Sequence, residues 1–125
     1  MLTIKKIITT EEIDNYFKKE NIDHPMGQEQ FMGVYDGDCL IGMGSISLVN
    51  LKVYMNFIYT EEDDFGLRHG LAKALLNMAD LSGIQIVYGN NPELFELYSI
   101  LRFKEENGEY VLPLEGYFTA HSCEN

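Results

Sequence analysis

The stretch from Leu67 to Leu76, LRHGLAKALL, places a glycine and a small residue where a helical pattern begins. Free backbone N–H groups at a helix start, together with the helix dipole, form an anion site that suits phosphates. Gly70 would let a ligand approach the backbone, and Ala72 keeps the next contact small. The alternative is ordinary helix packing, and no G-x-G-x-x-G dinucleotide motif is present. The stretch therefore predicts a phosphate-binding turn, and the surrounding sequence must decide between this turn and ordinary packing.

Few other side chains offer chemistry. Glu61 or Glu62 could accept an amine proton through water, or could be solvated loop charge. The three histidines, His24, His69 and His121, lie far apart in sequence, so no metal site is predicted. No motif supports a Ser/His/Asp nucleophile either.

The elements that must position these residues read as a sheet flanked by helices. Hydrophobic periodicity and turn residues predict strands at 2–8, 31–35, 39–50, 51–60, 84–89, 102–106 and 109–118. The strands at 31–35 and 39–50 meet through Asp36-Gly37-Asp38, and the last two meet through Asn107-Gly108.

Three helices are expected between these strands. The first, over 10–20, is introduced by a capping box of Thr9 and Glu12. The second runs over about 70–81, and Pro92 opens the third with Asn91 as its cap. The strand at 84–89 follows a helix and is expected to pair in parallel with 51–60. The fold class is therefore α+β (mixed α/β), a mostly antiparallel sheet of six or seven strands with one parallel pair.

Composition narrows the class of protein. The 125 residues fit one domain over 1–125, and the net charge of −11 disfavours nucleic acid. That acidity suits a cationic or amine partner, or simply keeps the protein soluble. No apolar run approaches the roughly 20 residues that a membrane span needs, and the N-terminus does not read as a signal peptide. We therefore expect a cytoplasmic protein with no membrane partner, whose Cys39 and Cys123 are reduced thiols.

Two motifs resemble the GNAT superfamily of acyl-CoA-dependent N-acyltransferases. Residues 67–72 are similar to its Q/R-x-x-G-x-G/A signature: Gly70 and Ala72 match, and Leu67 replaces the Gln or Arg. A second family block reads approximately N-x-x-A-x-x-x-Y-x-x-x-G-F. Three of its positions match and two differ, the matches being Asn91, Tyr98 and Phe103 and the replacements Leu94 for Ala and Arg102 for Gly. The order of strands and helices agrees with the family over nearly the whole chain.

The resemblance implies an acetyl-CoA site without a metal. Backbone N–H groups would hold the diphosphate of CoA along Leu67, Arg68, His69, Gly70, Leu71, Ala72 and Lys73. The backbone of Phe57, Ile58 and Tyr59 would pair with the pantetheine arm and polarise the thioester. Asn91 would contact the arm, and Tyr98 would protonate the leaving thiolate as general acid.

The function implied is transfer of an acetyl group from acetyl-CoA to a primary amine by direct attack. The acceptor would be a small-molecule amine or a peptide amine, bound by the first helix and the 21–30 loop. The alternative is a catalytically silent GNAT-like module that binds CoA, another ligand or a protein. Leu67 and the acidic run at 61–64 favour this alternative. The apolar tail suggests either a homodimer or core packing, through Val111, Leu112, Leu114, Tyr117 and Phe118.

Overall fold

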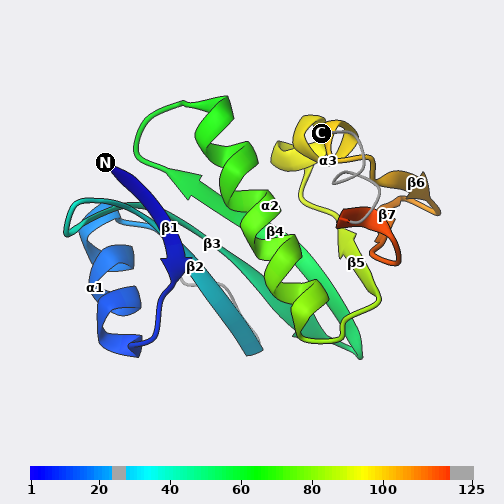
Figure 1. The fold of residues 1–125 in the computed structure, drawn as a ribbon, viewed down its shortest axis with the longest axis horizontal. Coiled ribbons are helices and arrows are strands. Elements are labelled where there is room, and N and C mark those ends of the chain that lie inside the picture. Colours follow the sequence, from blue (N-terminus) through cyan, green and yellow to red (C-terminus); the bar gives the residue numbers. More distant parts are fainter. Residues whose placement is uncertain (24–27, 119–125) are drawn as a thin grey trace.

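The computed structural model describes residues 1–23 and 28–118. Strands and helices follow one another along this part of the chain (Figure 1), in the order β1 (Leu2–Lys6), α1 (Thr10–Glu20), β2 (Gln28–Asp36), β3 (Cys39–Val49), β4 (Lys52–Thr60), α2 (Phe65–Leu81), β5 (Ile86–Gly89), the 3₁₀ turn η1 (Pro92–Leu94), α3 (Phe95–Ile100), β6 (Lys104–Glu106) and β7 (Glu109–Pro113).

The strands form one seven-stranded sheet in the order β1-β2-β3-β4-β5-β7-β6. Only β4 and β5 run parallel, pairing Val53 with Val87 and Tyr54 with Tyr88; the other neighbours are antiparallel. The predicted mostly antiparallel sheet with one parallel pair is therefore confirmed. Gly37, Asn107 and Gly108 have positive φ, as the two predicted hairpin turns require.

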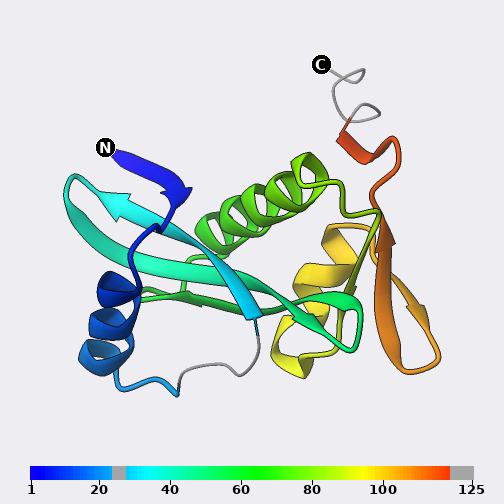
Figure 2. The ribbon, with the colours of Figure 1, turned by 90° about the horizontal axis from the view of Figure 1, so that it is seen from below.

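Helices cover both faces of the sheet. Alternation along β4 sends Ile58 into a core cluster with α2 and α3, and sends Phe57 and Tyr59 into a second cluster with α1. Figure 2 shows α1 and α2 on opposite sides of the strands. Strand β4 therefore packs against α2 and α3 on one face of the sheet and against α1 on the other. This fits the predicted sheet flanked by three helices.

Helix α2 begins at Phe65, five positions before the start that the sequence predicted, and that prediction is wrong. Asp64 is the N-cap, and its Oδ1 accepts a hydrogen bond from the Leu67 amide at 3.1 Å. One turn of helix therefore precedes Gly70, and the ring of Phe65 stacks on His69 with centroids 6.3 Å apart. The sequence predicted the helix only from about residue 70, but this cap and ring pair stabilise an earlier first turn.

Smaller differences concern strand ends and the tail. Strand β7 ends at Pro113 rather than near residue 118, because Gly116 takes a positive φ and the chain turns. Leu112, Leu114 and Tyr117 are buried within the chain, so core packing accounts for these apolar residues without a dimer. Strand β2 already starts at Gln28, inside the predicted 21–30 loop. Part of that loop with His24, and the tail with His121 and Cys123, fall outside the described residues.

Candidate functional site

Strand β4 changes its pairing halfway along its length. Ser45 pairs with Phe57 and Ser47 with Tyr54, so Met55 and Asn56 lie opposite the single residue Ile46 of β3. This is a β-bulge, a feature that turns backbone groups out of the regular ladder. Beyond the bulge, within the part of the chain that the structure describes, the paired register of 57–60 is with β3 alone. The second edge of 57–60 is therefore open to an extended ligand.

Tyr98 of α3 lies against the bulge. The side chain is fully buried, and its hydroxyl lies 2.7 Å from the Met55 carbonyl oxygen and 2.9 Å from Asn56 Oδ1. The Asn91 amide donates a long hydrogen bond of 3.4 Å to the same hydroxyl. Burial raises the pKa of Tyr98 well above its ordinary value. The phenol therefore keeps its proton at neutral pH, donates toward β4 and accepts a hydrogen bond from the Asn91 amide.

Three asparagines bridge the point where β4 and β5 part. Asn56 Nδ2 donates to Asn90 Oδ1 at 2.6 Å, and the Asn90 amide donates to Asn56 Oδ1 at 2.9 Å. Asn91 Nδ2 donates to the Asn56 carbonyl at 2.8 Å, while its Oδ1 caps η1 by accepting from the Glu93 amide at 3.1 Å. Asn91 thus has both the predicted capping contact and a contact with β4.

The sequence analysis missed Asn56 and Asn90. Asn56 interrupts the apolar strand YMNFIY, and asparagine is depleted in strands. That single polar residue was the available signal for a break in the ladder. Gly89 was also missed: a Cβ at this position would overlap the ring of Tyr98, so only glycine admits the tyrosine.

The predicted phosphate-binding turn is placed differently from the expectation. Leu67 through Lys73 lie inside α2, where the amides from His69 onward belong to the helix ladder. The amides that a helix leaves without an intrahelical acceptor are here those of Phe65 and Gly66. Arg68, expected to supply positive charge, instead pairs with Asp63 at 2.7 Å. The diphosphate role predicted for Leu67–Lys73 therefore loses the free amides on which it rested.

This placement gives a stability prediction for Gly70. A Cβ at Gly70 would meet Ile4 Cδ1 at 3.5 Å, an ordinary contact. Since Gly in a helix interior costs about 0.5–1 kcal/mol relative to Ala, Gly70→Ala should stabilise the protein by about that amount. Urea denaturation measures the change in the free energy of unfolding. A loss of more than 1 kcal/mol would contradict the helical position of Gly70.

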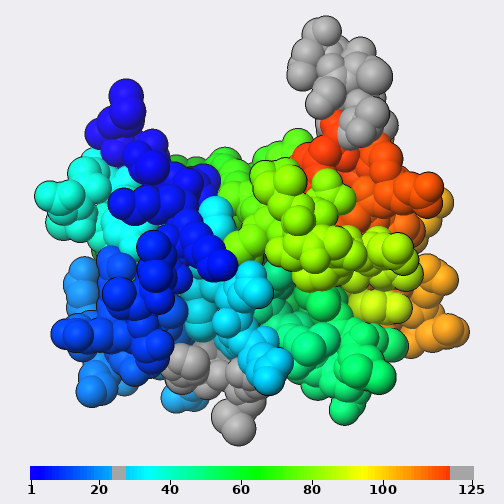
Figure 3. Space-filling view, turned by 60° about the horizontal axis from the view of Figure 1, so that its bottom comes forward, coloured from blue at the N-terminus to red at the C-terminus, as the bar shows by residue number. Residues whose placement is uncertain are grey.

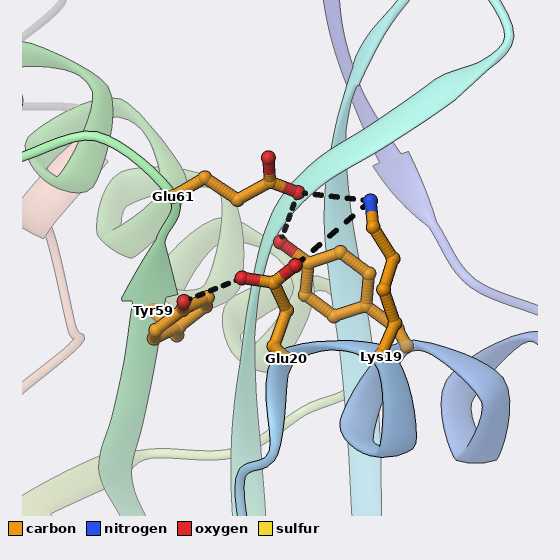
Figure 4. Close-up of polar contacts among 5 residues, drawn as sticks. Lys19, Glu20, Tyr59 and Glu61 are labelled. Atoms are coloured by element: carbon orange, nitrogen blue, oxygen red, sulfur yellow. Dashed lines mark hydrogen bonds and ion pairs between the residues drawn. The ribbon is translucent and has the colours of Figure 1, made fainter.

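Glu61, the predicted candidate for a general base, is held by α1 (Figure 4). Tyr16 donates to Glu61 Oε2 at 2.9 Å, and Lys19 Nζ lies 3.5 Å from the same oxygen. Nearby, Tyr59 donates to Glu20 at 2.7 Å, and this hydrogen bond raises the pKa of Tyr59 to about 12. These contacts fasten α1 to the end of β4. The contacts involve only the side chain of Tyr59, so its backbone stays on the open edge of β4. Glu62, the other candidate, is exposed on the loop.

Metal binding and membrane insertion also bear on function. Within residues 1–23 and 28–118 there is no group of three or more His, Cys, Asp or Glu side chains that could hold a metal ion. The helices of this part of the chain are too short or too polar to cross a membrane.

Comparison with known proteins gives a clear result for fold and none for sequence. No family model matches the chain, and neither does any curated protein. Among solved structures, the ribosomal-protein-S18-alanine N-acetyltransferase of Escherichia coli is similar with a TM-score of 0.69 at 15% identity, over 91% of this chain and 94% of that one. The PaiA N-acetyltransferase of Thermoplasma acidophilum, solved with coenzyme A, gives 0.57 at 14% identity, over 89% and 96%.

The chain has the GNAT fold, and the predicted resemblance is confirmed at that level. A third neighbour, the KacTA–DNA complex, gives a TM-score of 0.66 at 16% identity, over 98% of this chain and 99% of that one. A protein of this fold thus occurs in a complex with DNA. The absence of a nucleic-acid partner stays an expectation based on the net charge of −11.

Proposed function

We propose that the chain is an N-acetyltransferase that moves an acetyl group from acetyl-CoA to a primary amine. The observation that carries this proposal is the open edge of β4 at 57–60, next to a bulge against which the Tyr98 hydroxyl lies. The GNAT fold of the neighbouring acetyltransferases supports it. The chemistry supplied by acetyl-CoA is an acetyl group activated as a thioester.

The residues of the open edge fit the arm of this co-substrate. Phe57, Ile58 and Tyr59 present backbone N–H and C=O groups to an extended chain that carries amides of its own, which is strand addition. Asn91 reaches β4 at the start of this edge and would contact the arm beside it. An N–H group of the bulge would polarise the thioester carbonyl, as in an oxyanion hole.

Tyr98 supplies the proton that the departing sulfur needs. Transfer requires the amine to lose one proton and the sulfur to gain one. The hydroxyl of Tyr98 now donates toward the Met55 carbonyl at 2.7 Å, so this hydrogen bond would have to open before the proton could pass to the sulfur. Because burial raises the pKa of Tyr98, the phenolate is costly, so the proton must be replaced quickly. Direct attack on the thioester needs no covalent intermediate on the chain.

The diphosphate end fits less well. The Phe65 and Gly66 amides and the positive end of the α2 dipole favour an anion, but Asp63 and Asp64 flank them. Removing both charges in Asp63→Asn/Asp64→Asn keeps a capping side chain at 64. Unit charges several Å apart in water interact by about 0.5–1 kcal/mol, so CoA should bind roughly fivefold tighter to this variant.

Isothermal titration with CoA measures that change, and Asp80→Asn, a charge removed from the exposed last turns of α2, is the matched control. Equal affinity of the double variant and the wild type would argue that the diphosphate does not reach the start of α2.

A second function is favoured by the acidic start of α2. The Arg68–Asp63 pair and the Asp64 cap neutralise the place where a CoA diphosphate would otherwise find positive charge. A GNAT-like module that binds a ligand or protein without transferring an acetyl group would not need positive charge at the start of α2.

One experiment separates the two functions. Thermal unfolding is followed with and without millimolar acetyl-CoA, and free thiol release is then measured over a panel of primary amines. The proposed enzyme should be stabilised and should release thiol with at least one amine. Stabilisation without release over the panel would favour the silent module. Absence of stabilisation at millimolar acetyl-CoA would end both CoA-based functions.

A further inference from the structure

A second polar group lies beside the asparagine bridge, on the sheet face that α2 and α3 leave free. Tyr54 and Tyr88 stand at paired positions of β4 and β5, with ring centroids 5.7 Å apart. Their neighbours Val53 and Val87 pack into the core cluster of α2, so alternation points both rings away from that helix. The rings are half-buried and reach solvent. Figure 3 shows that the β3–β4 turn and the β6–β7 hairpin, which flank these strands, both reach the surface on one face.

An ammonium group occupies the space between the Tyr88 ring and a carboxylate. Lys52 Nζ lies 4.6 Å from the Tyr88 ring centroid and 3.4 Å from Glu109 Oε1. The Tyr54 hydroxyl donates to Glu109 Oε2 at 2.8 Å, which fixes the carboxylate between the two strands. A carboxylate together with aromatic faces is the chemistry that recognises alkylammonium ions. We call Tyr54, Tyr88 and Glu109 the ammonium cage.

Lys52 is a replaceable occupant of this cage. Its side chain is 45% exposed, whereas that of Glu109 is 26% exposed. An exposed ion pair is weak, and a lysine head on a flexible stem is easily displaced by a competing ammonium ion. Withdrawal of Lys52 would leave Glu109 held by Tyr54, so the cage would keep its shape.

Hydrogen bonds connect the cage to the candidate site. Asn90 lies near Glu109 and, together with Tyr54 and Lys52, keeps the pKa of Glu109 below its ordinary value, Tyr54 having the largest effect. Asn90 also forms two hydrogen bonds with Asn56. Asn56 Oδ1 in turn lies 2.9 Å from the Tyr98 hydroxyl. A ligand in the cage would therefore lie at the end of a continuous polar path to Tyr98.

We propose that the ammonium cage binds an alkylammonium group that the acceptor carries in addition to its reacting amine, and that Lys52 is an internal occupant which this group displaces. The proposal rests on the acetyltransferase function for the identity of the ligand as an acceptor, but binding itself needs no acetyl-CoA. The class of ligand is a molecule with two amines, either a diamine or a basic peptide, of which one stays charged in the cage and the other is free to react. Neutral alcohols of the same length should not bind, since Glu109 and the ring faces select for charge.

The test uses n-butylammonium chloride as the probe, at constant ionic strength, with binding followed by the NMR signals of the tyrosine rings. Lys52→Gln should bind the probe about fivefold or more tighter than the wild type, because the competing ammonium is gone. The signals of Tyr54 and Tyr88 should shift, and n-butanol should shift neither. Adding Glu109→Gln to the Lys52→Gln variant should abolish the gain.

The matched control is Lys5→Gln. Lys5 Nζ also lies 4.6 Å from a tyrosine ring, that of Tyr35, but on β1 away from the cage. This variant should bind the probe as the wild type does. Equal binding by Lys52→Gln and the wild type, or shifts that avoid Tyr54 and Tyr88, would overturn the cage.

The outcome also separates the cage from the proposed enzyme. Tight probe binding in Lys52→Gln without thiol release in any assay would retain the cage and end the transferase. Turnover with a KM for the amine that is unchanged in Lys52→Gln and in Glu109→Gln would retain the transferase and overturn the cage. The substituted residues Lys5, Lys52 and Glu109 are all at least partly exposed. Circular dichroism and thermal unfolding should therefore show a wild-type fold for each variant.

Discussion

Tyr98→Phe should reduce the turnover of acetyl transfer by about 100-fold, because it removes the proton donor for the leaving thiolate. The phenylalanine ring retains the contacts with Phe103 and Tyr110, at centroid distances of 5.0 and 5.4 Å. The KM for acetyl-CoA should change little, since the arm binds along β4 and not on the hydroxyl. Steady-state thiol release with saturating amine measures both quantities.

The same variant tests a structural role of the hydroxyl. The Met55 carbonyl would lose its 2.7 Å hydrogen bond in a buried place, so the free energy of unfolding should fall by about 1–3 kcal/mol. If the hydroxyl only positions the bulge, the loss of turnover should be the same for acyl donors with acidic and with ordinary leaving thiols. If it donates a proton, the loss should be smaller for the donor with the more acidic leaving thiol, because that thiolate needs less help.

Tyr110→Phe is the control for Tyr98→Phe. Tyr110 packs on Tyr98, and the hydrogen bonds given above at the bulge do not involve it. Its variant should keep turnover within about twofold, since surface and half-buried changes away from special features have small effects. Turnover of Tyr98→Phe equal to that of Tyr110→Phe would remove the proton-donor role.

Gly89→Ala should destabilise the protein strongly and also lower activity. The added Cβ would overlap the Tyr98 ring and come within 2.7 Å of its hydroxyl oxygen. The ring is fully buried and packed between Phe103, Tyr110 and Phe95, so it cannot move away without displacing others. Overpacking of this kind costs about 1–3 kcal/mol or more, and Tm should fall by roughly 5–15 °C.

Gly70→Ala is the natural comparison, because the two variants add the same methyl group with opposite expected signs. Differential scanning calorimetry of both proteins measures the difference directly. A Gly89→Ala protein as stable as the wild type would mean that Tyr98 does not lie against residue 89. If Gly89→Ala is still folded at the assay temperature but has lost turnover together with the Tyr98–Met55 hydrogen bond, the packing at residue 89 supports the candidate site.

Local signals accounted for much of the fold. Helix α1 with its Thr9 cap and the Asp-Gly and Asn-Gly turns follow from short stretches whose preferences agree with the tertiary structure. The parallel β4–β5 pair followed from the general rule that a strand, a helix and a second strand form a right-handed crossover. The capping role of Asn91 also followed from the sequence, because Pro92 marks the first turn of the segment after it.

Features that depend on a partner strand or on competing caps did not follow from the sequence. The Met55–Asn56 bulge requires the register of β3, which no single strand encodes. The start of α2 depended on Asp64 acting as a cap, whereas in a run of four acidic residues no single one stands out as the cap. The ammonium cage joins Tyr54, Tyr88 and Glu109 from three strands, so only the folded sheet brings it together.

The most direct measurement is an amide NMR titration of the protein with acetyl-CoA. If the open edge of β4 receives the arm, the largest shifts should fall on the amides of Phe57, Ile58 and Tyr59, with further shifts at Asn91 and at Phe65–Gly66. The β6–β7 hairpin should be almost unaffected. Saturable binding whose shifts leave 57–59 unchanged, or no binding at millimolar acetyl-CoA, would contradict the proposed site.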